Sequence, residues 1–392
     1  MEYVKLGDIA KIVAGSTAPK ENQFNDNIGL PFIRAGHLED LCNNYDLRKL
    51  PKIDENNKNI KKQVKVPKNT IIFAKSGMSC MKSRVYQTTE ECYIVNHLAG
   101  VICSENVNPS YLKYYFMVNK PNRLIVDESY PSIRLSDISN MDIYLPNLDT
   151  QQKIAEVLDK AQELIDKRKE QIDALDELVK SRFIEMFGKG DYQIVKTEDI
   201  CEFITKGTTP KSNEIFECYT EGFIPYLKVY NLSFDGTMLF NDNPQYVTRD
   251  THNGFLARSK VFPNDVLMNI VGPPLGKFSL VPSDFDEWNI NQAIAIFRAT
   301  DKVKPIYLLH ALKQPNVLRP FIDSAVGVRQ QNISLSQCRN IEIPLPPIEL
   351  QNEFADFVKQ VDKLKSQMET SLKELEDNFN SLMQKAFKGE LF

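Results

Sequence analysis

Basic and amide side chains gather in loops that occur at matching places in the two halves of the chain. Arginine, lysine, glutamine, asparagine and tyrosine are the side chains that hydrogen-bond to phosphates and to the edges of bases. The same residue types are also common on solvated loops that bind nothing. The candidates for contact with a nucleic acid are Arg34, His37, Lys75, Ser76, Lys82, Arg84, Tyr130 and Arg134 in the first half, and Lys228, Tyr230, Lys277, Arg329, Gln330 and Gln331 in the second.

Residue patterns that carry enzymatic chemistry are missing from the sequence. The stretch from Gly272 to Phe278 looks like a phosphate-binding loop, but three residues separate its glycines instead of four, and Phe278 replaces the magnesium-binding Ser or Thr. The four histidines show no i, i+4 pair, and the seven cysteines form no Cys-x-x-Cys, which argues against a zinc site or structural disulfides. We therefore expect a non-catalytic chain that holds no metal or cofactor of its own.

The composition is that of a globular protein with room for two domains and connecting helices, at 392 residues with 42% apolar and 26% charged residues. Because the net charge is −4, a surface for DNA would have to be a local basic patch. Neither a signal peptide nor an apolar run of about 18 residues is apparent, so we expect a cytoplasmic chain that does not span a membrane.

Two heptad patterns, 200 residues apart, predict the elements that position these loops. Each alternates apolar residues at steps of four and three, which describes a helix with one narrow apolar seam that must pair with another. The seam residues are Ile154, Leu158, Ala161, Ile165, Ile172, Leu175, Val179 and Met186 in the first helix, and Phe354, Val358, Val361, Met368, Leu372, Leu375, Phe379, Leu382 and Ala386 in the second. Charged residues occupy three seam positions, Arg168 and Arg182 in the first helix and Lys365 in the second. Off the seam lie Val157, Leu164, Leu178 and Phe183, where we expect partial exposure.

The globular segments before the two helices also repeat each other. Residues 17–20 (TAPK) match residues 208–211 (TTPK), and residues 31–34 (PFIR) match residues 225–228 (PYLK). Short apolar runs separated by Gly, Pro, Asn and Asp predict strands with irregular loops, and Pro109 and Pro305 each open a predicted helix. The chain is therefore predicted to be an internal duplication, with two heads and a paired helical rod.

Longer motifs at the ends of the helices resemble those of the specificity subunits of type I restriction–modification systems, over essentially the whole chain. They are Leu145-Pro146 followed by residues 151–155 (QQKIA), residues 181–188 (SRFIEMFG), residues 344–351 (PLPPIELQ), and residues 384–392 (QKAFKGELF). One departure is Tyr144, which stands where the second repeat has Pro344.

The resemblance implies an α+β fold of two tandem α/β target-recognition domains with small, mostly antiparallel sheets, joined by two long helices packed as an antiparallel coiled coil. The expected boundaries are 1–148 for the first domain, 149–188 for the central helix, 189–347 for the second domain and 348–392 for the C-terminal helix. Each domain would read one half of an asymmetric double-stranded DNA sequence, and the rod would set the gap between the halves.

The resemblance also implies a role in phage defence with two kinds of partner. These are methyltransferase subunits, two in number, which use S-adenosylmethionine to methylate adenine, and restriction and translocase subunits, which use ATP and Mg²⁺.

Two other interpretations fit the residues. A structural adaptor, with protein-binding heads and a coiled-coil spacer, fits the heptads equally well and would show no DNA sequence preference. An enzyme with an unfamiliar site in the loops would show turnover by the purified chain.

Overall fold

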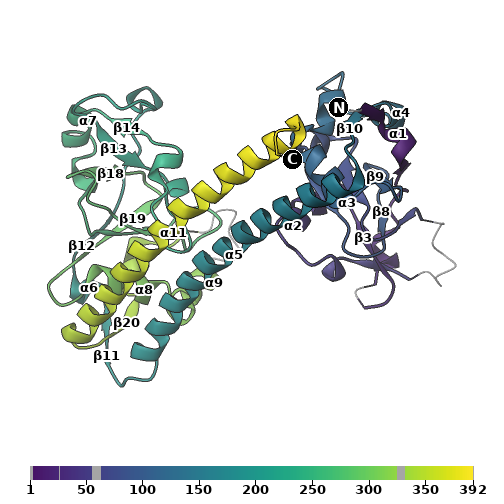
Figure 1. The fold of residues 1–392 in the computed structure, drawn as a ribbon. Coiled ribbons are helices and arrows are strands. Elements are labelled where there is room, and N and C mark those ends of the chain that lie inside the picture. Colours follow the sequence, from purple (N-terminus) through teal and green to yellow (C-terminus); the bar gives the residue numbers. More distant parts are fainter. Residues whose placement is uncertain (1–2, 26, 55–62, 325–331, 392) are drawn as a thin grey trace. The chain divides into compact units, whose positions relative to one another are not determined.

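The repeated apolar runs form two sets of strands with the same topology. In the computed structural model, residues 3–25, 27–54, 63–324 and 332–391 are described. The chain divides into one unit of Met1–Lys169 with Thr370–Phe392 and a second unit of Glu170–Glu369. Each unit contains one head and part of each of the long helices α5 (Leu148–Phe187) and α11 (Ile348–Lys388) (Figure 1).

The head of the first unit contains two four-stranded sheets and one two-stranded ribbon. The sheets have the orders β2-β9-β6-β7 and β4-β3-β8-β5, and the ribbon pairs β1 with β10. All pairs are antiparallel except β3 and β8. The strands are β1 (Tyr3–Lys5), β2 (Ala10–Ala14), β3 (Leu30–Ile33), β4 (Lys52–Ile53), β5 (Lys65–Val66), β6 (Ile71–Ala74), β7 (Val85–Gln87), β8 (Cys92–Ile94), β9 (Leu98–Cys103) and β10 (Asp142–Tyr144); the helices are α1 (Leu6–Ile9), α2 (Leu38–Cys42), α3 (Pro109–Val118) and α4 (Leu135–Ser139).

The head of the second unit repeats this arrangement strand for strand. Its sheets have the orders β12-β19-β16-β17 and β14-β13-β18-β15, its ribbon pairs β11 with β20, and β13 and β18 are parallel. The strands are β11 (Gln193–Lys196), β12 (Cys201–Lys206), β13 (Ile224–Leu227), β14 (Tyr246–Val247), β15 (Lys260–Val261), β16 (Val266–Asn269), β17 (Phe278–Leu280), β18 (Trp288–Ile290), β19 (Ile294–Ala299) and β20 (Glu342–Leu345); the helices are α6 (Thr197–Ile200), α7 (Arg249–Asn253), α8 (Pro305–Leu312), α9 (Pro315–Ser324) and α10 (Leu335–Arg339). The predicted fold class, two similar α/β heads with small sheets and long helices, is confirmed.

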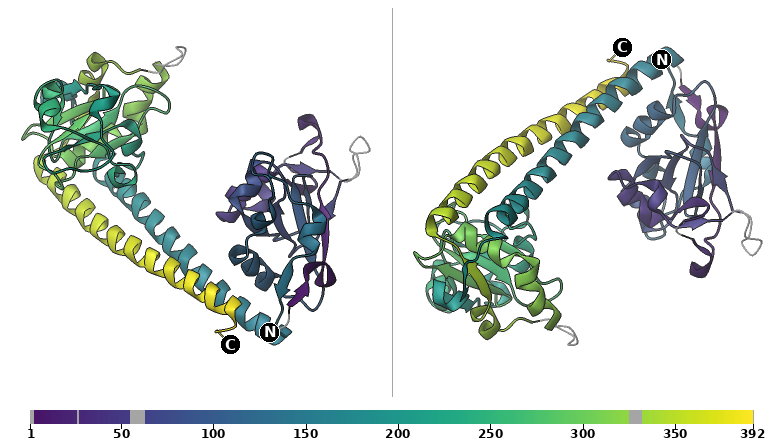
Figure 2. Two further views of the ribbon diagram at one scale, coloured as in Figure 1. Left: turned by 90° about the horizontal axis from the view of Figure 1, so that it is seen from above. Right: turned by 90° about the horizontal axis from the view of Figure 1, so that it is seen from below.

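Within each unit α5 and α11 lie side by side and antiparallel (Figure 2). In the second unit the direction follows from two contacts, because Asp176 pairs with Lys365 and the ring of Phe183 lies against that of Phe354. In the first unit Lys169 of α5 pairs with Glu376 of α11. In the first unit the seam side chains of Ile154, Leu158 and Ile165 are buried with Phe379, Met383 and Ala386, and Leu372, Leu375 and Leu382 are partly buried. In the second unit Val179, Phe354, Val358 and Val361 are buried, and Leu175 packs beside them.

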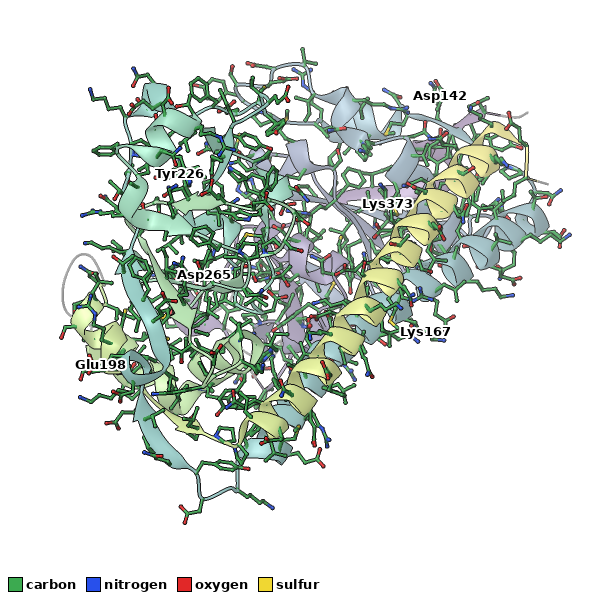
Figure 3. The ribbon with its side chains drawn as sticks, turned by 90° about the vertical axis from the view of Figure 1, so that its left-hand side faces the viewer. Asp142, Lys167, Glu198, Tyr226, Asp265 and Lys373 are labelled. Atoms are coloured by element: carbon green, nitrogen blue, oxygen red, sulfur yellow. The ribbon has the colours of Figure 1, made fainter. Side chains whose placement is uncertain are left out.

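The outer faces of the helix pair carry charge and some apolar surface. Lys167 of α5 and Lys373 of α11 are exposed (Figure 3), and so are Leu164 at 55% and Leu178 at 47%. Val157 is half-buried. The prediction that Phe183 is partly exposed is wrong, because its side chain is 5% exposed and its ring stacks on Tyr307 of α8 at a centroid distance of 5.7 Å. The helix therefore buries an additional face against its own head.

One buried glutamine in each unit fastens the start of a long helix to the head. The amide oxygen of Gln151 accepts the backbone N–H of Asn108 at 2.9 Å, and its amide nitrogen donates to the carbonyls of Asn106 and Pro146. Gln351 repeats this with the N–H of Lys304 at 2.8 Å and the carbonyls of Lys302 and Pro346. Because both glutamines are 0–1% exposed, these backbone groups depend on them for hydrogen bonds.

Candidate nucleic-acid interface

Several strands of the first head end at one common edge. Three backbone hydrogen bonds join them. The N–H of Val95 donates to the carbonyl of Ile33 at 3.0 Å, that of Asn96 to the carbonyl of Ser16 at 2.9 Å, and that of Lys75 to the carbonyl of His97 at 2.8 Å. The turns that follow β3, β6 and β8 are therefore held beside each other. This edge carries Arg34, Lys75 and His97.

A second loop is joined to the same edge. The N–H of Gly77 donates to the carbonyl of Pro131 at 3.0 Å, and the N–H of Ile133 donates to the carbonyl of Lys75 at 2.7 Å. Tyr130, which is 83% exposed, and the exposed Arg134 flank this connection. Loops that lie more than 50 residues apart in the sequence thus form one polar surface, which we call the strand-end edge of the first head.

The side chains at this edge are held in defined orientations. The Arg34 guanidinium lies 2.7 Å from a Glu21 carboxylate oxygen and 4.9 Å from the centroid of the Phe24 ring. Nδ1 of His37 accepts the backbone N–H of Arg34 at 3.2 Å, and burial together with the charge of Arg34 lowers the pKa of His37. The ring is therefore neutral at pH 7, with Nε2 as a donor. Ser76 Oγ lies 2.8 Å from Nδ1 of His97.

Two of the predicted residues of the first head lie in a different environment. Arg84 contacts Glu39 of α2 at 2.5 Å, and Lys82 lies 3.9 Å from the same carboxylate. Arg84 also lines a groove that faces α3 and α5. These two cations are thus anchored to α2, and none of the hydrogen bonds that assemble the strand-end edge involves them.

The second head builds the same edge with different side chains. The backbone N–H of Asn291 donates to the carbonyl of Leu227 at 3.0 Å, that of Thr208 to the carbonyl of Ile290 at 3.2 Å, and that of Ile270 to the carbonyl of Ala293 at 2.8 Å. Tyr226, labelled in Figure 3, donates from its hydroxyl to the carbonyl of Thr208 at 3.0 Å.

The predicted residues of the second head occupy this edge and its flank. Lys228 opens the 3₁₀ turn η7 (Val229–Asn231), and its N–H donates to Oδ1 of the buried Asn231 at 2.9 Å. Tyr230 is 39% exposed. Lys277 Nζ lies 5.7 Å from the ring of Phe234, which is 56% exposed. The predicted residues Arg329, Gln330 and Gln331 lie outside the described residues.

The structure adds residues that the loop comparison did not select. His97 belongs to the edge through its contact with Ser76, and Arg258 Nε donates to Thr208 Oγ1 at 2.9 Å in the second head. The repeat contains a signal for His97, because the pair Asn96-His97 aligns with Asn291-Gln292. Arg258 has no such signal, because its contact joins residues 50 positions apart.

Among the residues described, no group of three His, Cys, Asp or Glu side chains is placed to hold a metal ion. Their seven cysteines are unpaired, and burial raises the pKa of the thiols of Cys92, Cys103, Cys201 and Cys338 to about 12. The helices in this part of the chain include none that is long and apolar enough to cross a membrane.

Comparison with known proteins supplies a family. The model of the family described as "Type I restriction modification DNA specificity domain" matches residues 1–176 and 189–377. The specificity subunit of the type I restriction enzyme EcoBI of Escherichia coli is 33% identical over 141 residues, which are 34% of this chain and 29% of that protein. The putative MjaX specificity subunit of Methanocaldococcus jannaschii is 22% identical over 388 residues, 93% of this chain and 87% of that protein.

The MjaIX specificity subunit of the same archaeon is also similar to this chain, which aligns with 35% of the length of that subunit. Two solved structures share the fold. One is a chain from a study of complex assembly and conformational transition in a type I restriction–modification system. It has a TM-score of 0.60 and 18% sequence identity, and the alignment covers 100% of this chain and 98% of that one. The other is an S subunit from M. genitalium, with a TM-score of 0.57 and 15% sequence identity. The alignment covers 98% of this chain and 96% of that one.

Proposed function

The chain belongs to the type I restriction modification DNA specificity family, and from this premise we propose that it selects the DNA target of a type I complex. Each head reads one half of an asymmetric, two-part sequence. The helices α5 and α11 set the number of base pairs between the halves. The chain itself is a non-catalytic reader, and it works inside the cell.

The proposal is supported by a comparison of the two heads, which share the same backbone arrangement at the strand-end edge but carry different side chains there. Arg34 and Lys228 begin equivalent turns, and their N–H groups donate to His37 Nδ1 and Asn231 Oδ1, at 3.2 and 2.9 Å. His97 of the first head is replaced by Gln292 in the second. Because bases are distinguished by the donors and acceptors on their edges, a retained frame with changed side chains suits two readers of different sequences.

The partners belong to the same proposal. Methylation of adenine with S-adenosylmethionine is performed by two methyltransferase subunits, and cleavage driven by ATP and Mg²⁺ is performed by restriction and translocase subunits. The exposed apolar side chains of Leu164 and Leu178 on α5 offer those subunits a surface to cover.

The test is selection of bound sites from random double-stranded DNA by the complex of this chain with its methyltransferase subunit. Arg34→Ala should relax the bases read in one half of the site, and Lys228→Ala those in the other half, at a cost of about 1–3 kcal/mol for a lost base contact. Arg48→Ala is the matched control, because Arg48 is an exposed cation of the first head that pairs with Asp46 at 2.9 Å.

Three results would contradict the proposal. If both variants altered the same half, the assignment of one head to each half would be wrong. If the complex selected no sequence at all, the protein-binding adaptor would be favoured. Methyl transfer by the purified chain alone would identify an enzyme.

A further inference from the structure

In the first unit a groove of about 630 Å³ lies between the head and the long helix α5. Its walls are the end of β7, the exposed side of α3 and one face of α5, and we call it the α3–α5 groove. The lining residues used below are Ser83, Gln87, Ser110, Lys113, Tyr114, Met117, Asp159 and Asp166. The volume falls in the range of about 300–1,000 Å³ that is usual for ligand sites.

A largely buried lysine, Lys113 of α3, lines this groove. The side chain of Lys113 is 21% exposed, and its Nζ lies 4.1 Å from the centroid of the Tyr114 ring and 3.7 Å from Asp159. The Tyr114 hydroxyl donates to the same carboxylate at 2.7 Å. Burial lowers the pKa of Lys113, although Asp159 and Asp166 oppose this, so a further carboxylate next to Lys113 would stabilise its charge.

The opposite wall offers further polar groups. Ser83 Oγ is buried and makes no hydrogen bond within the described residues, and Ser83 itself has a left-handed backbone with φ of 49°. Arg84 lines the groove next to it. A buried hydroxyl without a partner costs free energy, so this wall is suited to a ligand that supplies one.

The second unit contains the equivalent place, and there it is occupied by the chain itself. The pairing of the strands and helices of the two heads sets Lys113 against Leu309, Met117 against Lys313, and Gln87 against Leu280. Residues 235–238 of the second head lie against α8 and α11. The carboxylate of Asp235 lies 3.5 Å from Lys365, and Lys313 Nζ donates to its backbone carbonyl.

The two places differ in polarity at four equivalent positions, of which three are polar in the first unit and one, Met117 against Lys313, is polar in the second. Where the second unit has the apolar Leu280, Ile306 and Leu309, the first has the polar Gln87, Ser110 and Lys113. The remaining cavity of the second unit is smaller, at about 390 Å³. The first head has α2 in place of the loop of residues 232–239, and Leu41 and Cys42 of α2 line the α3–α5 groove.

We propose that the α3–α5 groove binds an acidic peptide segment of another subunit of the complex, which places a carboxylate beside Lys113 as Asp235 does beside Lys365 in the second unit. The inference rests on the proposed function for the identity of that subunit, the methyltransferase. A DNA backbone is the less suitable occupant, because a peptide segment, residues 235–238, fills the equivalent place in the second unit, and Asp159 and Asp166 on α5 can accept peptide N–H groups.

The first experiment is photo-crosslinking in the assembled complex of the full chain, its methyltransferase subunit and target DNA. A benzoylphenylalanine replaces Thr89, an exposed residue at the rim of the groove, and in a control chain it replaces the exposed Glu105 of the same head. The expected result is a crosslink from position 89 to an acidic segment of the methyltransferase, with no such crosslink from position 105. A crosslink from position 89 to DNA alone, or to neither partner, overturns the inference.

The second experiment measures the affinity of the chain for the methyltransferase. We expect Lys113→Gln to weaken binding about tenfold and Lys113→Glu to weaken it further, with partial rescue when the crosslinked acidic residue is changed to lysine. Lys11→Glu, a change at an exposed lysine on β2, is the control. Thermal unfolding of each variant shows that it is folded, and the milder Lys113→Gln gives the result if Lys113→Glu does not fold.

Site selection separates this inference from the function on which it rests. A complex that selects its two-part DNA target normally, but gives no crosslink and no loss of affinity in Lys113→Gln, disproves the groove inference alone. A chain that binds no methyltransferase and selects no DNA disproves both.

Discussion

Replacing Lys365 by methionine should destabilise the second unit, because Lys365 is a charged residue in an apolar seam and neutralises two carboxylates. Its side chain is 17% exposed, and Nζ lies 2.8 Å from Asp176 and 3.5 Å from Asp235. Breaking a fully buried pair costs about 3–5 kcal/mol, and a surface pair is worth about 0–1 kcal/mol. Because Asp176 and Asp235 are 34% and 40% exposed, we expect an intermediate loss of about 2 kcal/mol.

The assay is thermal unfolding followed by calorimetry, in which a unit of this size should lose about 4–8 °C in Tm. Lys363→Met is the matched control, since Lys363 is exposed on the same helix and its change should stay within about 0.5 kcal/mol. In the wild type, hydrogen bonds from Ser233 and Thr237 and the charge of Lys365 hold the pKa of Asp235 low against the effect of burial. Without Lys365 the Asp235 carboxylate takes up a proton more easily, so the deficit of the variant should shrink as the pH falls toward 4.

Equal stability of Lys365→Met and the wild type at pH 7 would refute this reasoning. It would show that desolvation of the lysine already cancels its attraction to the two carboxylates. A deficit that stays constant between pH 7 and pH 4 would show that packing of the methionine side chain, and not the unpaired carboxylates, is responsible.

Three further predictions follow from the buried polar groups and the long helices. Burial lowers the pKa of His310 to about 3, so its neutral form is favoured in the fold; stability should be complete above the unfolded pKa of about 6.5 and fall by about 2 kcal/mol at pH 5, and His310→Phe should abolish that slope in urea unfolding. Gln151→Leu and Gln351→Leu should each cost about 2 kcal/mol, visible as lower Tm of the unit that contains the change, and an unchanged Tm would contradict their role as anchors. Seven residues that continue the heptad, inserted after Ile172 and after Leu372, should lengthen the preferred DNA gap by about three base pairs, because the helices grow by about 10 Å; the affinity should fall because three base pairs also rotate the duplex by about 100°. Site selection with that variant checks the last prediction, and an unchanged gap would show that the helices do not set it.

The long helices are predictable from the sequence because heptad periodicity is a local pattern that repeats many times. The structure gives α5 as Leu148–Phe187 and α11 as Ile348–Lys388. The environment of Phe183 is not predictable in this way, because its burial depends on Tyr307 of α8, which is more than 100 residues away. The partners of Lys365 are equally distant, since Asp176 lies 189 positions earlier in the chain.

The candidate interface is predictable at the level of loops and less so at the level of side chains. The internal repeat aligns Arg34 with Lys228 and so selects corresponding turns of the two heads. It does not show that the Lys75 loop is hydrogen-bonded to Ile133, because that contact joins two loops 58 residues apart in the sequence. Nor does it separate Arg84 from the edge, because the ion pair with Glu39 forms only when α2 packs beside β7.

The two-stranded ribbons have a consequence for how such a chain can change during evolution. β1 pairs with β10 and β11 pairs with β20, so the first and last strands of each head lie next to each other. A head is therefore attached to the remainder of its unit through a neighbouring entry and exit, as in an inserted cassette. Recombination that exchanges everything between those strands has to preserve one ribbon, one anchoring glutamine and the start of one helix. If each head reads one half of the DNA target, as proposed above, replacement of a whole head would change that half without gradual change of single contacts.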